Sequence, residues 1–230
     1  MNTLHEDDFL ENPTQRVPVC LCLDTSGSMR GDSINALNKG VETFFQSLRD
    51  DEVALFSADV CIITMGGHYA PWLQCTQDFS GLSNIDHAPT FVAEGGTPLG
   101  DAVNLALDLL EKRKNEYKNS GIEYYQPWLV IMTDGLPEGD STHNAVQNAQ
   151  ERATNLVKSN KLVVMPIYIG NQNVEQGIKT LAGFSPKNPP ARLDGLRFSD
   201  FFKWLSMSVS GISQSNTKNF NLPPMNWTVQ

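Results

Sequence analysis

The 230-residue sequence lacks the short motifs of the common nucleotide-binding and hydrolytic enzymes. It has no GxxxxGK[ST] phosphate loop, no GxGxxG segment after an apolar run, and no GxSxG nucleophile elbow. The histidines show no ligand spacing to one another, and we expect each of them on the surface or in a loop. They are His5, His68, His87 and His143. We therefore expect that the protein is not an enzyme.

Basic charge is also scarce. The chain has 17 Lys and Arg against 26 Asp and Glu, a formal net charge of −9, which argues against a general binder of nucleic-acid backbones. Basic residues do cluster within 112–118, but Glu111 and Glu116 interleave them. This spacing predicts a solvated helix face with internal ion pairs. A subunit of a nucleic-acid-associated complex remains an alternative.

No apolar run approaches the roughly 18 residues that span a bilayer. The first 16 residues are acidic and lack the apolar segment of a secretory signal. We therefore expect a cytoplasmic protein without membrane contact, in which cysteines stay reduced. There are only four of them: Cys20 and Cys22 on one face of a predicted strand, and Cys61 and Cys75 without zinc-ribbon spacing. We interpret all four as inert core thiols.

What the sequence does have is a regular alternation of apolar strand-length runs with helical periodicities. Strands are expected at 17–24, 59–67, 71–79, 127–134, 162–170 and 191–194. Helices are expected at 33–49, 98–118, 141–159, 173–183 and 199–213. This pattern predicts an α/β fold of three layers, with a doubly wound, mostly parallel six-stranded sheet. The segments 59–67 and 71–79 lie too close for a helical crossover, so we expect 71–79 to be an antiparallel edge strand.

The predicted domain covers residues 16–213, between an acidic extension at 1–15 and a tail at 214–230. The tail is rich in Asn and Pro. It either packs back on the domain through Leu222 and Trp227 or docks on a partner, and the sequence leaves both alternatives open. Pro166 is awkward in its predicted strand because it cannot donate a ladder hydrogen bond.

Oxygen-bearing side chains gather where the predicted strands end. Asp24 closes the strand VPVCLCLD, and Ser26 and Ser28 follow it. Thr97 lies in GGTPLG just before a helix, and Asp134 closes LVIMTD. In open α/β sheets, ligands bind outside the carboxyl ends of the strands. If the strands of Asp24 and Asp134 are neighbours, both carboxylates face one crevice.

Two carboxylates and three hydroxyls form an all-oxygen set of the kind that hard divalent cations prefer, Mg²⁺ above all. Ca²⁺ and Mn²⁺ are alternatives. Gly27 is expected to let the loop turn sharply. Each position also has a purely structural interpretation. Thr97 before a proline resembles a helix N-cap, Ser28 or Asp32 could cap the helix at 33, and Asp134 could serve a strand-end turn.

The segments DTSGSM, GGTPLG and MTDGLP resemble the three parts of the metal-ion-dependent adhesion site of von Willebrand factor A domains. The motif DxSxS…T…D matches at Asp24, Ser26, Ser28, Thr97 and Asp134. The flanks, including DTSGSMRGDSINALNKGV and FSDFFKWLSMSVS, are similar to the bacterial TerY-type proteins of tellurium-resistance and stress-response clusters. That family usually has IITF followed by Asp where this chain has IITMGG, a departure expected to affect packing near residue 65 and not the metal set.

This resemblance implies a metal-dependent module for protein–protein contact, in which a partner's carboxylate completes the coordination of the ion. TerY-type proteins occur beside a Ser/Thr protein kinase and a PP2C-like phosphatase, which makes those two the expected partners. A metal-dependent phosphoryl-transfer enzyme is the alternative from another class. A haloacid-dehalogenase mechanism, however, would need a second Asp where this chain has Ser26.

Overall fold

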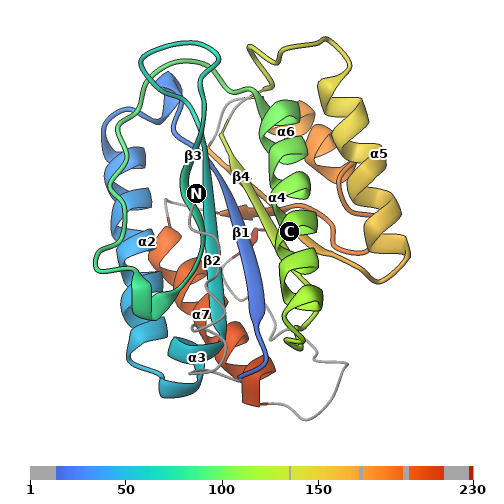
Figure 1. The fold of residues 1–230 in the computed structure, drawn as a ribbon. Helices are drawn as coiled ribbons and strands as arrows, with labels where there is room; N and C mark the ends of the chain where they lie inside the picture. The colour runs from blue at the N-terminus through green and yellow to red at the C-terminus, as the bar shows by residue number, and fades with distance from the viewer. Residues whose placement is uncertain (1–13, 135, 171–172, 194–196, 215–227, 230) are drawn as a thin grey trace.

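The computed structural model describes residues 14–134, 136–170, 173–193, 197–214 and 228–229. In these residues a seven-stranded sheet runs through the centre of the molecule, with the strand order β3-β2-β1-β4-β5-β6-β7 (Figure 1). The strands are β1 (Val17–Asp24), β2 (Ala58–Met65), β3 (Leu73–Gly81), β4 (Trp128–Thr133), β5 (Val163–Ile169), β6 (Ala191–Leu193) and β7 (Thr228–Val229).

The predicted six-stranded sheet is confirmed, with five parallel strands and β3 antiparallel beside β2 at one edge. At the other edge the sequence analysis missed the two-residue strand β7, which pairs antiparallel with β6. Strand β1 lies between β2 and β4. All its residues are buried, which explains why it reads as one apolar run without alternation.

Helices cover both faces of the sheet (Figure 1). One core packs α2 and α7 against the face that carries Val19 and Leu21; the other packs α4 and α5 against the face that carries Cys20 and Cys22. The helices are α2 (Asp32–Arg49), α3 (Glu52–Ser57), α4 (Leu99–Asn119), α5 (Ala145–Lys158), α6 (Val174–Ala182) and α7 (Phe198–Gln214). Helix α3 was not predicted, because its single apolar turn has no helical period; Asp51 caps it by accepting the N–H of Ala54 at 2.9 Å.

Pro166 lies inside β5, opposite Ile131 of β4. On the other side of β5, β6 pairs only from Ile167 onward. The strand therefore has an open side at the proline, which is where a residue without an N–H is tolerated.

Among the described helices, none is long and apolar enough to cross a bilayer. His5, Leu222 and Trp227 lie outside the described residues. The division into an extension, a domain and a tail stays a prediction.

Candidate functional site

The two predicted carboxylates come together because their strands are neighbours. Strands β1 and β4 pair in parallel, with Leu23 opposite Met132. Asp24 ends β1, and Asp134 follows Thr133 at the end of β4. Both carboxyl groups therefore lie at the carboxyl edge of the sheet, as the strand-end pattern predicted.

A chain of hydrogen bonds links the oxygen-bearing side chains of β1 and β4. The hydroxyl of Ser28 donates to Asp134 Oδ1 at 2.7 Å, and the hydroxyls of Ser26 and Ser28 lie 2.9 Å apart. Since Ser28 donates its only hydroxyl proton to Asp134, Ser26 donates to Ser28. The backbone N–H of Ser26 donates to Asp24 Oδ1 at 2.9 Å, and Thr133 donates to Asp24 Oδ2 at 2.6 Å.

These spacings fit the coordination sphere of a small hard cation. Mg²⁺ holds its oxygen ligands at 2.0–2.1 Å in an octahedron, so neighbouring ligands lie about 2.9 Å apart. The Ser26–Ser28 and Ser28–Asp134 oxygen pairs have almost this separation, at 2.9 and 2.7 Å. A cation placed here would replace the hydroxyl hydrogen bonds without large movement of the side chains.

The electrostatics of the site also favour a cation. Asp24 is fully buried. Burial, and secondly the charge of Asp134, raise the pKa of Asp24 to about 6, although the hydrogen bonds from Ser26 and Thr133 oppose the rise. Burial raises the pKa of Asp134 as well. In the described part of the chain no lysine or arginine forms an ion pair with either carboxylate.

Thr97 lies at the same edge of the sheet, on a loop whose backbone is hydrogen-bonded to the loop after β1. The backbone of Thr25 accepts the N–H of Glu94 at 2.9 Å, and the N–H of Gly27 donates to Gly95 at 2.9 Å. The N–H of Glu138, just beyond β4, donates to the carbonyl of Thr97 at 2.9 Å. Thr97 itself is buried. The backbone thus ties the segments of all five predicted ligands together. Hydrogen bonds connect the side chains of Ser26, Ser28 and Asp134 directly, and the backbone N–H of Ser26 extends this network to Asp24.

The helix-cap alternatives for these residues do not match what their side chains do. Gly31 precedes α2 without a side-chain cap, so neither Ser28 nor Asp32 caps that helix. Pro98 occupies the cap position of α4, again without a side-chain hydrogen bond, and Thr97 is not its cap. Asp134 uses a carboxylate oxygen for Ser28. Their role as metal ligands stays a prediction, but helix capping no longer competes with it.

The loop does turn tightly at Gly27, where a short 3₁₀ helix begins (Gly27–Met29), but the turn does not require glycine, because the φ angle of Gly27 is not positive. A Cβ atom at Gly27 would meet only the carbonyl oxygen of Gly95, at an ordinary 3.6 Å. Gly66, in the segment that departs from the TerY pattern, is the position where the backbone requires glycine. Its φ is +142°, and a Cβ atom would lie 2.2 Å from the carbonyl oxygen of Thr25. This departure therefore bears on the backbone next to Asp24, besides the packing near residue 65.

Sequence reasoning missed several residues that support the site. Thr133 and Tyr168 bond to the aspartates: the first to the side chain of Asp24, the second to the backbone of Asp134 at 3.1 Å. Trp72 lies against three glycines of the surrounding loops, where any Cβ atom would clash with its ring; these are Gly95, Gly96 and Gly139. Thr133 was signalled by its place directly before Asp134, whereas nothing in the sequence pointed to Trp72.

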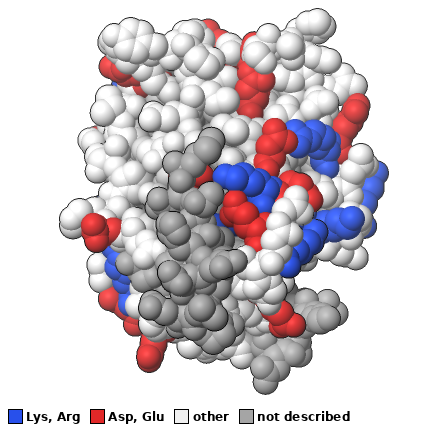
Figure 2. Space-filling view, viewed as in Figure 1, with Lys and Arg blue, Asp and Glu red and all other residues white. Residues whose placement is uncertain are grey.

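Three of the four basic residues of the cluster on α4 form ion pairs within the chain. Figure 2 shows Lys and Arg interleaved with Asp and Glu on the side of the molecule where α4 lies. Lys112 pairs with Glu116 at 3.7 Å, and Lys114 pairs with Glu111 at 2.5 Å. The prediction of ion pairs is confirmed, but that of a solvated face is wrong for Lys114 and for Arg113, which are both buried.

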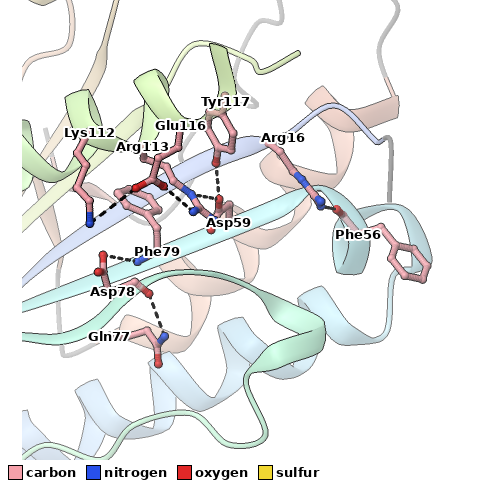
Figure 3. Close-up of polar contacts among 10 residues, drawn as sticks. All are labelled: Arg16, Phe56, Asp59, Gln77, Asp78, Phe79, Lys112, Arg113, Glu116 and Tyr117. Atoms are coloured by element: carbon pink, nitrogen blue, oxygen red, sulfur yellow. Dashed lines mark hydrogen bonds and ion pairs between the residues drawn. The ribbon is translucent and has the colours of Figure 1, made fainter. Parts of the chain in front are cut away.

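Arg113 belongs to a buried network at the opposite end of the sheet (Figure 3). Its Nε donates to Asp59 Oδ2 at 2.7 Å, and its Nη1 donates to Glu116 at 2.9 Å. The hydroxyl of Tyr117 donates to the same oxygen of Asp59. This network joins the start of β2 to α4 and holds the guanidinium of Arg113 within the chain.

The cysteines only partly follow the prediction of inert core thiols. Cys20, Cys22 and Cys61 are buried, but Cys75 is exposed on the edge strand β3. Hydrogen bonds from the thiols of Cys20 and Cys75 hold the pKa of Cys61 below its usual range, against the effect of burial. Of the described histidines, His68, His87 and His143 are exposed, as expected.

The family is shown by comparison with known sequences. Residues 19–192 match the model of the von Willebrand factor type A domain. The chain therefore belongs to this family, whose members commonly act as protein-interaction modules and often bind a divalent metal at the adhesion site. No curated protein matches the chain.

Solved structures with the same fold include two domains of bacterial pili. The pilus adhesin SpaC from Lactobacillus rhamnosus GG superposes with a TM-score of 0.65 at 13% identity, over 85% of this chain and 31% of that one. This chain thus spans about a third of the adhesin's length. The vWF domain of the pili tip protein Mfa5 from Porphyromonas gingivalis gives 0.54 at 10% identity, over 87% and 95%.

A third structure is proximal thread matrix protein 1 from the mussel byssus. It gives a TM-score of 0.55 at 15% identity, over 86% of this chain and 49% of that one. All three similarities concern the fold, since sequence identity at this level does not carry function.

Proposed function

We propose that the protein is a metal-dependent protein-interaction module that binds a carboxylate of its partner through a divalent cation. Asp24, Ser26, Ser28, Thr97 and Asp134 would hold the ion. The observation that carries this proposal is the row of oxygen atoms of Ser26, Ser28 and Asp134 at octahedral spacing, next to the buried carboxylate of Asp24, with no ion pair to either aspartate in the described residues. The donor set is all oxygen, so Mg²⁺ is the first choice, before Mn²⁺ or Ca²⁺.

The ligand set also accounts for the need of a partner. Three of the five ligands are neutral hydroxyls, so two carboxylates only balance the charge of the ion and leave it able to attract a further anion. A protein of net charge −9 would repel an acidic partner at long range. A shared cation between two carboxylates overcomes this repulsion at the contact itself.

We propose that this module works in a bacterial stress-response system of the tellurium-resistance type, in the cytoplasm. The support is the likeness of the metal loop and of α7 to TerY-type proteins. The corresponding partners are a Ser/Thr kinase and a PP2C-like phosphatase, each of which would offer an Asp or Glu to the ion.

We further propose that the site binds without catalysing a reaction. Around Asp24 and Asp134 the described hydrogen bonds come from hydroxyl and backbone N–H groups, and none comes from a histidine or lysine. A phosphoryl-transfer enzyme would add a nucleophile or a general acid to such a set. Turnover of a phosphoester that depends on Mg²⁺ and on Asp24 would support that alternative.

The first test is calorimetric titration of Mg²⁺ into the wild type, Asp24→Ala and Asp134→Ala. Asp32→Ala is the matched control, because it removes an exposed carboxylate at the start of α2 that caps nothing. We expect saturable binding in the wild type and the control, and none in the two site variants. A pull-down of the kinase and the phosphatase, with Mg²⁺ or with chelator, then tests the partner. Equal capture by the wild type and both site variants would contradict the proposal.

A further inference from the structure

A second group of potential ligands lies away from the oxygen site, at the edge of the sheet formed by β2 and β3. Cys20 of β1 and Cys61 of β2 are direct partners in the parallel ladder, and both are buried. Cys75 of β3 continues this row of thiols to the exposed edge strand. The row leads from the core beneath α4 to solvent.

Asp78 joins the outer two thiols. The sulfur atoms of Cys61 and Cys75 and a carboxylate oxygen of Asp78 all lie within 4.8 Å of one another. Asp78 Oδ1 accepts the N–H of Phe79 at 2.8 Å (Figure 3). Within the described residues, its second oxygen has no hydrogen bond and is available to a ligand.

The backbone of β3 is irregular where these residues converge. Residues 75 and 78 are three apart, and a regular strand would place them on opposite faces of the sheet. The β2–β3 ladder shifts register twice, between Val60 and Ile62 and between Ile62 and Ile63. Such bulges turn side chains relative to the strand. Here they bring Asp78 to the face that carries Cys75.

We propose that Cys61, Cys75 and Asp78 form a binding site for a thiophilic divalent cation, with Zn²⁺ as the first candidate. Two sulfurs and one carboxylate suit zinc, which binds sulfur at about 2.3 Å and oxygen at about 2.0–2.2 Å. In a tetrahedron of these radii, neighbouring ligands lie about 3.4–3.8 Å apart. Because no two of the three ligand atoms are more than 4.8 Å apart, they need to close by little more than about an ångström at most, and two of them belong to the edge strand.

The two sites of the protein would then differ in chemistry. The site of Asp24 and Asp134 offers only oxygen and favours a hard cation, whereas the edge site offers mostly sulfur and favours a borderline-soft cation such as Zn²⁺. With three protein ligands the zinc keeps a fourth position facing solvent, as in zinc sites that bind an exogenous ligand.

The experiment uses Co²⁺ as a spectroscopic substitute for Zn²⁺, with the full chain kept under a thiol-free reductant. Cobalt bound by thiolates shows a charge-transfer band in the near ultraviolet, which oxygen ligands do not produce. We expect one equivalent of Co²⁺ to give this band and Zn²⁺ to remove it. Cys75→Ser is the main variant because Cys75 is exposed and its replacement leaves the core intact.

We expect Cys75→Ser to abolish the band and Asp78→Asn to weaken apparent Zn²⁺ affinity at least about tenfold, since loss of an outer-shell partner alone costs 10- to 100-fold. The controls are Asp24→Ala, which removes the oxygen site, and Cys22→Ser, whose thiol bonds to Ala102 instead. Both should keep the band. Absence of the band in reduced wild type would overturn the proposal, even if Cys61 and Cys75 form a disulfide on oxidation. An equal band in Cys75→Ser would overturn it too.

Discussion

Two aspartates buried in neighbouring strands have opposite electrostatic surroundings. Asp24 is the last residue of β1 and Asp59 the second residue of β2, and since these strands are parallel the two carboxylates lie at opposite ends of the sheet. Both are almost completely buried. Asp59 faces the guanidinium of Arg113 at 2.7 Å, whereas the donors to Asp24 in the described part of the chain are a hydroxyl and a backbone N–H.

Under the proposed function, the difference separates a carboxylate that is paired within the chain from one that binds a cation. Asp59 carries its counter-charge within the chain, in a network that fastens α4 to the sheet. Asp24 has no such partner in the described residues, and its pKa rises to about 6. A buried carboxylate without a cation is costly, and proteins keep such groups mainly at functional sites. We propose that a cation from solution supplies this counter-charge.

Removing the guanidinium that pairs with Asp59 should have the largest effect on stability. Arg113→Met leaves Asp59 charged and buried, and we expect it to lower the free energy of unfolding by about 3–5 kcal/mol. Urea denaturation at neutral pH measures the loss. The matched control is Arg197→Met, whose ion pair with Asp200 is half-exposed and should cost less than about 1 kcal/mol. Similar losses in both variants would show that the Asp59 network carries no special weight.

Neutralising Asp24 should have the opposite effect and stabilise the protein. The pKa of Asp24 is raised in the folded protein, to about 6. Its contribution to stability is therefore complete below its unfolded pKa, near 4, and is lost as pH rises through 6. Without metal, Asp24→Asn should stabilise the protein by about 3 kcal/mol at pH 7 and by little at pH 4, because only the wild type has the charge to bury.

Unfolding in chelator across this pH range measures the prediction for Asp24→Asn, and added Mg²⁺ provides the control. With Mg²⁺ the wild type should be more stable than Asp24→Asn, since the ion stabilises only the wild type. An Asn variant that is less stable than the wild type at pH 7 in chelator would mean that Asp24 is balanced within the chain, as Asp59 is.

The glycines next to the site offer the next largest effect. Gly66→Ala forces a Cβ atom to within 2.2 Å of the Thr25 carbonyl, at a φ of +142°. We expect a loss of about 2–3 kcal/mol together with weaker Mg²⁺ binding, because Thr25 follows Asp24. Gly27→Ala is the control: it lies inside the metal motif but meets only an ordinary contact. Equal loss in both would indicate that the loop tolerates no side chain at all.

Much of the fold and of the candidate site could be predicted because local pattern determines both. The buried strand of Asp24 reads as an unbroken apolar run, and parallel neighbours place strand ends at one edge of the sheet. This argument predicted from the sequence that Asp24 and Asp134 lie close together if their strands are neighbours. The same logic gave the antiparallel edge strand from the short connection between 59–67 and 71–79.

What could not be predicted depends on contacts between distant segments. Trp72 touches glycines from two other loops, and Arg113 reaches a carboxylate 54 residues away. The exposure of Cys75 follows from the position of β3 at the sheet edge, and Asp78 reaches the same face through bulges that have no simple sequence signature. The apolar periodicity of a sequence indicates which residues are buried but not which residues they contact.

The smallest effect should come from the neutral donors of Asp24. Thr133→Val removes the hydroxyl that donates to Asp24 Oδ2 at 2.6 Å, and we expect a loss of about 1.5 kcal/mol at pH 7 in chelator, as for a hydrogen bond to a charged group. Since this bond lowers the pKa of Asp24, its loss should raise that pKa further and weaken Mg²⁺ binding more at pH 6 than at pH 8. Thr64→Val is the control, because the hydroxyl of Thr64 bonds to the neutral hydroxyl of Thr76 at 3.0 Å, and the effect of removing it should not vary with pH. If the stability lost in Thr133→Val did not vary with pH, Asp24 would already be protonated throughout this range. The hydrogen bond from Thr133 would then have no influence on the charge of the site.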